Sequence, residues 1–90
     1  MKYLVKVEKE AEKDILIAKC HYKLSNNEKM FNKDFLNLTE YLKANPYLFQ
    51  VYYKNIRVAH FKNFLYSIHF IINKQEVLIL RVLHQKQKFK

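Results

Sequence analysis

The sequence contains no glycine and no tryptophan, and it has one proline and one cysteine in 90 residues. Without glycine, turns that need a positive φ angle must use asparagine, which tolerates that conformation better than most residues. The single cysteine, Cys20, cannot form a disulfide within the chain and does not provide the thiolates of a metal cluster. Such low cysteine usage is typical of a reducing, intracellular compartment.

Long uncharged runs are missing as well. The longest extends only from residue 63 to residue 73, whereas a transmembrane helix needs about 20 apolar residues. The first residues carry charges at Lys2, Lys6 and Glu8 and have no apolar stretch, so we expect no signal peptide, no membrane partner and a cytoplasmic location. Glycine-rich phosphate loops and the hydrolase elbow Gly-x-Ser-x-Gly are also absent, which disfavours nucleotide hydrolysis and acyl transfer and predicts no cofactor.

Positive charge is concentrated in the second half of the chain. The formal net charge is +9. Residues 1–40 carry eight Lys against seven acidic residues, whereas residues 41–90 carry seven Lys and two Arg against a single acid, Glu76. A cationic half of this kind predicts a negatively charged partner, either a nucleic acid or an acidic protein; the simpler alternative is a solubilising surface.

The hydrophobic pattern changes period along the chain. Alternation over residues 3–7 predicts a strand, and an apolar stripe that begins at Ala11 predicts a helix over residues 9–24. A second stripe that begins at Phe31 predicts a helix over residues 28–44, which Asn45 and Pro46 end. Because only residues 25–27 separate the helices, ending the first and able to cap the second, we expect an antiparallel helical hairpin.

Three segments rich in Ile, Val, Phe and Tyr predict the remaining strands, over residues 56–61, 65–72 and 77–84. The residues between the last two predict a tight hairpin in which Asn73 takes the positive φ angle. The expected fold class is therefore α+β, in the order β-α-α-β-β-β, with the helical hairpin packed on one face of a small, mostly antiparallel sheet. Residues 1–90 are expected to form one domain, with a basic tail over residues 85–90 that is flexible or bound to a partner.

Arg57 and Arg81 are the only arginines, and both fall within predicted strands. Alternation places Arg57 on the side of Ala59 and Arg81 on the side of Ile79. Two exposed arginines on a sheet would form a clamp for a phosphate or a carboxylate. The alternative is that each is bridged to a nearby acid on a solvated strand face, and the sequence leaves both open.

His84, at the end of the last strand, is the candidate for proton transfer, because histidine titrates near neutral pH. A tight hairpin would place it beside residues 62–64; the alternative is a structural hydrogen bond at the strand end. His60 and His69 have no ligand partners at metal-binding spacing, so we expect hydrogen-bonded sheet residues and no metal site. Tyr52 and Tyr53 are expected to be core or rim aromatics.

Four segments in the second half resemble the RelE/ParE superfamily of bacterial type II toxins: residues 45–49 (NPYLF), 53–57 (YKNIR), 64–68 (FLYSI) and 82–85 (VLHQ). The apolar positions of the two predicted helices agree with the same family. The resemblance covers essentially the whole chain, and it implies the β-α-α-β-β-β fold and a toxin that a cognate antitoxin neutralises through an acidic or amphipathic segment.

The resemblance favours the ParE-like branch, which includes plasmid-stabilisation proteins. Gln85 stands where a Tyr is typical of the ribonuclease branches, and no Glu lies between Tyr41 and Gln75 to act as a general base. Leu65 replaces a proline that is usual in the family.

Three functions follow from these observations. In the first, the chain poisons DNA gyrase without catalysis, and the contact surface comprises Arg57, Arg81, His84, Lys86, Lys88 and Lys90. In the second, it is a RelE-like ribosome-dependent mRNA endoribonuclease, with His84 as the acid or base and with Arg57, Lys62 and Arg81 stabilising the charge on the scissile phosphate. In the third, it is an inactive family member that only binds its antitoxin.

Overall fold

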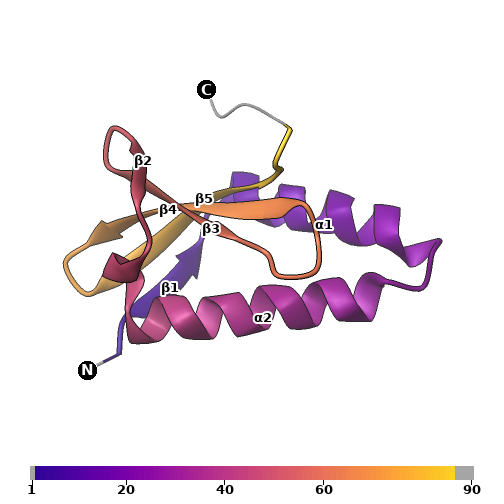
Figure 1. Ribbon diagram of the computed structural model, residues 1–90, viewed down its shortest axis with the longest axis horizontal. Helices are drawn as coiled ribbons and strands as arrows, with labels where there is room; N and C mark the ends of the chain where they lie inside the picture. The colour runs from indigo at the N-terminus through magenta and orange to yellow at the C-terminus, as the bar shows by residue number, and fades with distance from the viewer. Residues whose placement is uncertain (1, 87–90) are drawn as a thin grey trace.

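A five-stranded mixed sheet forms the centre of the fold (Figure 1). Its strands are β1 (Leu4–Val7), β2 (Val51–Tyr53), β3 (Ile56–His60), β4 (Tyr66–Asn73) and β5 (Glu76–His84), arranged in the order β1-β5-β4-β3-β2. β1 runs parallel to β5, and the other neighbouring strands are antiparallel. The structure is a computed structural model and describes residues 2–86. The α+β class and the predicted β-α-α-β-β-β frame are confirmed, with one further short strand, β2, at the edge of the sheet.

The two helices are α1 (Lys9–Lys23) and α2 (Glu28–Ala44). In the turn that joins them, Asn26 has a φ angle of 61°, as expected for asparagine in a chain without glycine. Residues 25–27 were expected to cap α2, but Asn27 at the N-cap position makes no capping hydrogen bond, and its side-chain amide donates to the Ser25 hydroxyl at 3.2 Å. α2 ends at the predicted point, and Pro46 begins a short 3-10 helix, η1 (Pro46–Leu48).

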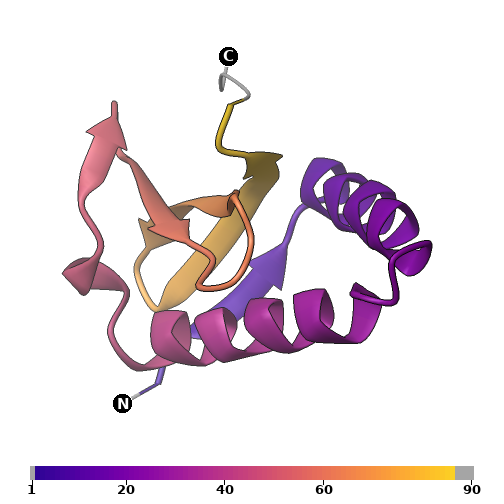
Figure 2. The ribbon, with the colours of Figure 1, turned by 45° about the vertical axis from the view of Figure 1, so that its right-hand side comes forward.

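The core lies between the helices and one face of the sheet. Phe31 and Leu42 of α2 and Ala11 of α1 are fully buried against Phe70 and Ile79 of the sheet. Because α1 and α2 each present an apolar stripe to this face, neither helix would be stable without the sheet. Figure 2 shows α2 running along the helix side of the sheet and α1 lying beside β5.

The two tight hairpins of the sheet use lysine at the positive φ angle. Lys74, between β4 and β5, has φ 58°, and Lys54, between β2 and β3, has φ 54°. The prediction that Asn73 would take this conformation is wrong, since Asn73 is still paired with Glu76 and the loop begins one residue later. The pairing of the strand ends, and not the residue preference, fixes the position of the loop.

A bulge in β5 changes which side chains share a face. Ile79 pairs with Phe70 and Arg81 pairs with His69, which leaves Leu80 without a partner on β4. Alternation along the sequence had placed Arg81 on the same side as Ile79. The extra residue reverses the alternation, so Arg81 lies on the face opposite Ile79, away from the core.

Candidate functional site

Arg81 is fixed by an ion pair with Asp14 of α1. Its Nε donates to Asp14 Oδ2 at 2.8 Å and its Nη2 donates to Oδ1 at 3.0 Å. The backbone N–H of Val82 donates to the same carboxylate at 2.9 Å. The hydrogen bond that Arg81 donates to Asp14 raises the pKa of Arg81, and partial burial opposes the shift. Arg81 therefore takes the second of the two predicted roles, a strand arginine bridged to an acid.

Arg57 lies on the other face of the sheet, since it pairs with the core residue Phe70 on β4. Its Nη1 donates to the carbonyl of Phe49 at 2.6 Å, and its guanidinium lies over the Tyr47 ring at 5.0 Å from the centroid. η1 and the segment after it therefore hold Arg57 near the edge of the sheet. Because Arg57 and Arg81 point to opposite faces, the structure does not bring them together as the predicted clamp.

His84 pairs with Tyr66 at the end of β5, and the two rings meet edge to face at 5.3 Å. The expected neighbours, residues 62–64, are replaced by Leu65 and Tyr66, because the two-residue β4–β5 loop and the bulge at Leu80 set a different register between β4 and β5. His84 Nδ1 accepts the backbone N–H of Lys86 at 3.2 Å. Burial raises the pKa of Tyr66, and Tyr22 and Asp14 add to the shift, so the Tyr66 hydroxyl remains neutral at physiological pH.

The predicted binding residues Lys88 and Lys90 lie outside the described residues, with most of the basic tail. Lys86 is exposed at the end of the described chain. Its backbone N–H donates to the His84 ring, so Lys86 lies next to His84.

His60 and His69 lie on the face away from the helices, on β3 and β4. His60 Nδ1 lies 2.6 Å from the Ser67 hydroxyl, which matches the expected hydrogen-bonded sheet residue. Burial lowers the pKa of His69; His60 and Arg81 act in the same direction, and Asp14 opposes them. Within residues 2–86, no three His, Cys, Asp or Glu side chains come close enough to hold a metal ion.

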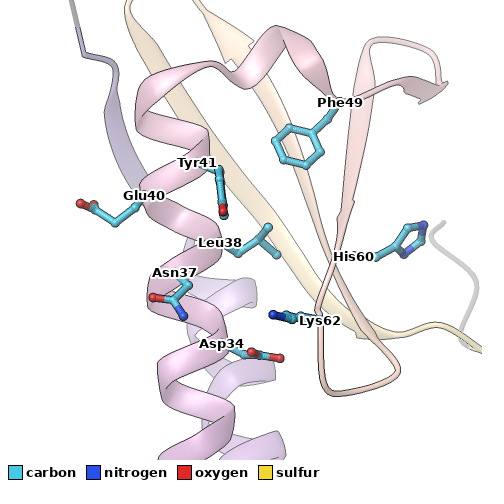
Figure 3. Close-up of a pocket in the computed structure, with 8 residues that line it drawn as sticks. All are labelled: Asp34, Asn37, Leu38, Glu40, Tyr41, Phe49, His60 and Lys62. Carbon is cyan, nitrogen blue, oxygen red and sulfur yellow. The ribbon is translucent and has the colours of Figure 1, made fainter.

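Lys62 lines a groove of about 700 Å³ between α2 and β3, which we call the α2–β3 groove (Figure 3). Leu38, Tyr41 and Phe49 supply its apolar surface, and Lys62 extends toward α2. The His60 ring points away from α2, so His60 lines the groove with its backbone side. Lys62 thus points to the side of the sheet edge opposite the His60 ring.

Tyr52 and Tyr53 are exposed, and Tyr52 is 68% accessible. β2, which carries both, was not predicted, because a strand of three residues with every side chain exposed has no hydrophobic alternation to detect. Lys54 lies over the Tyr53 ring at 5.4 Å from its centroid. The edge of the sheet therefore presents tyrosines together with Arg57, residue types that are enriched at protein interfaces.

None of the helices within residues 2–86 is long and apolar enough to cross a membrane.

The architecture, two helices packed on one face of a five-stranded mixed sheet, is shared with a known bacterial toxin–antitoxin structure. A chain of the chromosomal ParDE TA system from P. aeruginosa matches with a TM-score of 0.76 and 19% sequence identity, over 91% of this chain and 95% of that chain. At this identity the match shows the fold alone. A search of curated protein sequences finds no significant match.

The sequence gives the family directly. Residues 5–89 match the family described as the ParE toxin of the type II toxin–antitoxin system, parDE. Because the match covers nearly the whole chain, the chain belongs to the ParE toxin family, as the resemblance of its sequence segments predicted.

Proposed function

We propose that this toxin inhibits growth by binding DNA gyrase without catalysing a reaction, and that a cognate antitoxin neutralises it. Both partners would meet it in the cytoplasm. The observation that carries the proposal is that the groups needed for RNA cleavage do not converge. Arg81 is bound by Asp14, Arg57 lies on the opposite face, and Lys62 faces the α2–β3 groove while His84 stands at the end of β5. A cleaving site needs its proton-transfer group and its charge-stabilising groups around one phosphate.

The edge formed by η1, β2 and β3 supports a binding function. Arg57 is held by the Phe49 carbonyl and by the Tyr47 ring, so its remaining N–H groups have a fixed direction. Tyr52 and Tyr53 stand exposed beside it. Rigid tyrosine and arginine side chains are the residues that most often dominate binding energy at protein interfaces.

The test is to produce the chain alone from an inducible promoter and to score DNA damage and mRNA cleavage side by side, together with supercoiling by purified gyrase. We expect an SOS response and inhibition of gyrase, with intact mRNA. His84→Ala should retain most of the toxicity, whereas loss of a catalytic acid or base reduces a rate by about 10²–10⁴-fold. Arg57→Ala should weaken gyrase inhibition. Codon-specific mRNA cuts that disappear in His84→Ala would reject the proposal in favour of a ribonuclease, and the absence of any growth defect would indicate an inactive antitoxin-binding protein.

A further inference from the structure

The outer side of α1 carries apolar side chains that are exposed to solvent. Leu16 and Ile17 are 67% and 68% exposed, and Leu24, at the C-cap of the helix, is 93% exposed. Cys20, between them along the helix, is exposed as well. Because Cys20 is separated from each of the others by three or four positions, all of them lie on one side of α1, opposite the buried Ala18. We call this exposed set the α1 stripe.

The described part of the chain does not cover this stripe. α1 packs on β5 and α2 with its other side, and Figure 2 shows none of the described elements beyond its outer side. Single exposed apolar residues are common on a monomer, whereas a contiguous set on one helix face marks an interaction surface. α1 has 15 residues, so a contact along it is about 22 Å long, at the small end of specific interfaces. The stripe therefore predicts a weak association, with a dissociation constant in the micromolar range.

The charges beside the α1 stripe are self-complementary. The first turn of α1 carries Glu10 and Glu12, and the last turn carries His21 and Lys23. Glu12 and Lys23 are about three helical turns apart, so they flank the stripe on the same side. Both are exposed, and neither has an ion pair among the described residues.

An antiparallel pair of α1 helices would bring these charges together. A two-fold axis across two antiparallel helices places the same side of each helix in contact and the first turn of one beside the last turn of the other. Glu12 of one copy then meets Lys23 of the second copy, and the two helix dipoles run in opposite directions, which is favourable. Residues 9–23 carry four Lys against three acidic residues, so the repulsion expected from a net charge of +9 arises elsewhere on the chain.

We propose that a second copy of this chain occupies the α1 stripe, and that the two copies form a weak dimer through antiparallel α1 helices. Leu16 and Ile17 lie near the two-fold axis, and Glu12 pairs with Lys23 of the second copy at both ends of the contact. An anionic membrane surface fits less well, because the carboxylates of Glu10 and Glu12 flank the same stripe.

This contact leaves the proposed gyrase-binding edge free. Figures 1 and 2 both show β2 and α1 on opposite sides of the molecule. Tyr52, Tyr53 and Arg57 therefore remain accessible in each copy of the dimer. The inference does not rest on the proposed function, and the dimer would present two such edges to a target.

The apolar part is tested by sedimentation equilibrium of the full chain, with a reductant so that Cys20 forms no disulfide. We expect a dissociation constant of about 10–100 μM. Leu16→Lys should weaken the dimer at least about tenfold, because it places a charge from each copy near the axis. Leu36→Lys, at a position of α2 that is 53% exposed, is the matched control and should leave the constant unchanged. If Leu16→Lys does not fold, Ile17→Ala replaces it, with an expected loss of about fivefold.

The antiparallel arrangement is tested by exchanging the charges. Glu12→Lys and Lys23→Glu should each weaken the dimer at least about threefold, because each places like charges side by side at both ends of the contact. The double variant should regain the wild-type dissociation constant within about twofold, since it restores both pairs with their signs reversed. Lys33→Glu, at an exposed position of α2, changes the net charge as Lys23→Glu does and should have no effect.

A chain that remains monomeric up to about 500 μM would overturn the proposal. Equal dissociation constants for Leu16→Lys and Leu36→Lys would place a dimer contact elsewhere on the surface. A double charge variant that is as weak as the single ones would contradict the antiparallel arrangement. Phosphatidylglycerol vesicles provide the remaining comparison: if the monomeric chain binds them and Leu16→Lys abolishes that binding, the stripe contacts a membrane surface and not a second copy.

Discussion

Asp14 joins α1 to the edge of β5 where β1 ends. β1 pairs with β5 only as far as Ile79. Beyond that point, the backbone N–H of Val82 donates to the side chain of Asp14. The Asp14 carboxylate accepts this N–H and two guanidinium hydrogen bonds from Arg81. Three donors on one carboxylate, whose side chain is only 12% exposed, mark a structural contact between helix and sheet.

Asp14→Ala should therefore destabilise the fold by about 2–4 kcal/mol, because it leaves a half-buried guanidinium and an edge N–H without their acceptor. The measurement is the free energy of unfolding from urea titration. Glu12→Ala, on the exposed side of the same helix, should change that free energy by less than about 0.5 kcal/mol. A loss below about 1 kcal/mol for Asp14→Ala would show that water replaces the carboxylate at little cost.

Among the elements, the β4–β5 hairpin has a local conflict between residue type and backbone conformation. Lys74 has φ 58°, in the left-handed region that favours glycine. Lys74→Gly should raise the free energy of unfolding by roughly 0.5–1 kcal/mol. Glycine removes the steric cost of the positive φ angle, and this gain exceeds the loss from the greater conformational entropy of the unfolded chain. Gln75→Gly, one residue further along the loop, should lower it, because Gln75 does not have a positive φ angle. Equal effects of the two substitutions would contradict the strain at Lys74.

Sequence periodicity was sufficient to predict the long elements and insufficient for the irregular ones. The stripes beginning at Ala11 and Phe31 predicted both helices, because each is long and packs one face on the sheet. The bulge at Leu80 has no sequence signature, and it moved Arg81 to the opposite face. The pairing of Arg81 with Asp14 depends on where α1 lies against β5, a tertiary arrangement that residue spacing does not contain. The candidate site was therefore less predictable than the fold.

At the scale of the whole molecule, the surplus of positive charge and the partly buried His69 make the stability depend on pH. Burial holds the pKa of His69 below its usual value, and His60 and Arg81 act in the same direction against Asp14. Below about pH 6.5, the unfolded chain binds a proton at this site that the folded chain binds only at lower pH. The free energy of unfolding should therefore fall as the pH decreases from about 6.5 toward the pKa of folded His69, and this site should contribute nothing above about pH 7.5.

The check is the urea midpoint measured from about pH 7.5 to pH 5, compared between the wild-type chain and His69→Gln. The variant should lose less stability on acidification. His21→Gln, at an exposed position of α1, controls for the general self-repulsion that grows as a chain of net charge +9 gains further protons. That repulsion acts on the wild-type chain and both variants alike, so only His69→Gln should flatten the profile. If the His69→Gln and His21→Gln profiles coincide, the acid sensitivity belongs to the overall charge and not to the sheet histidine.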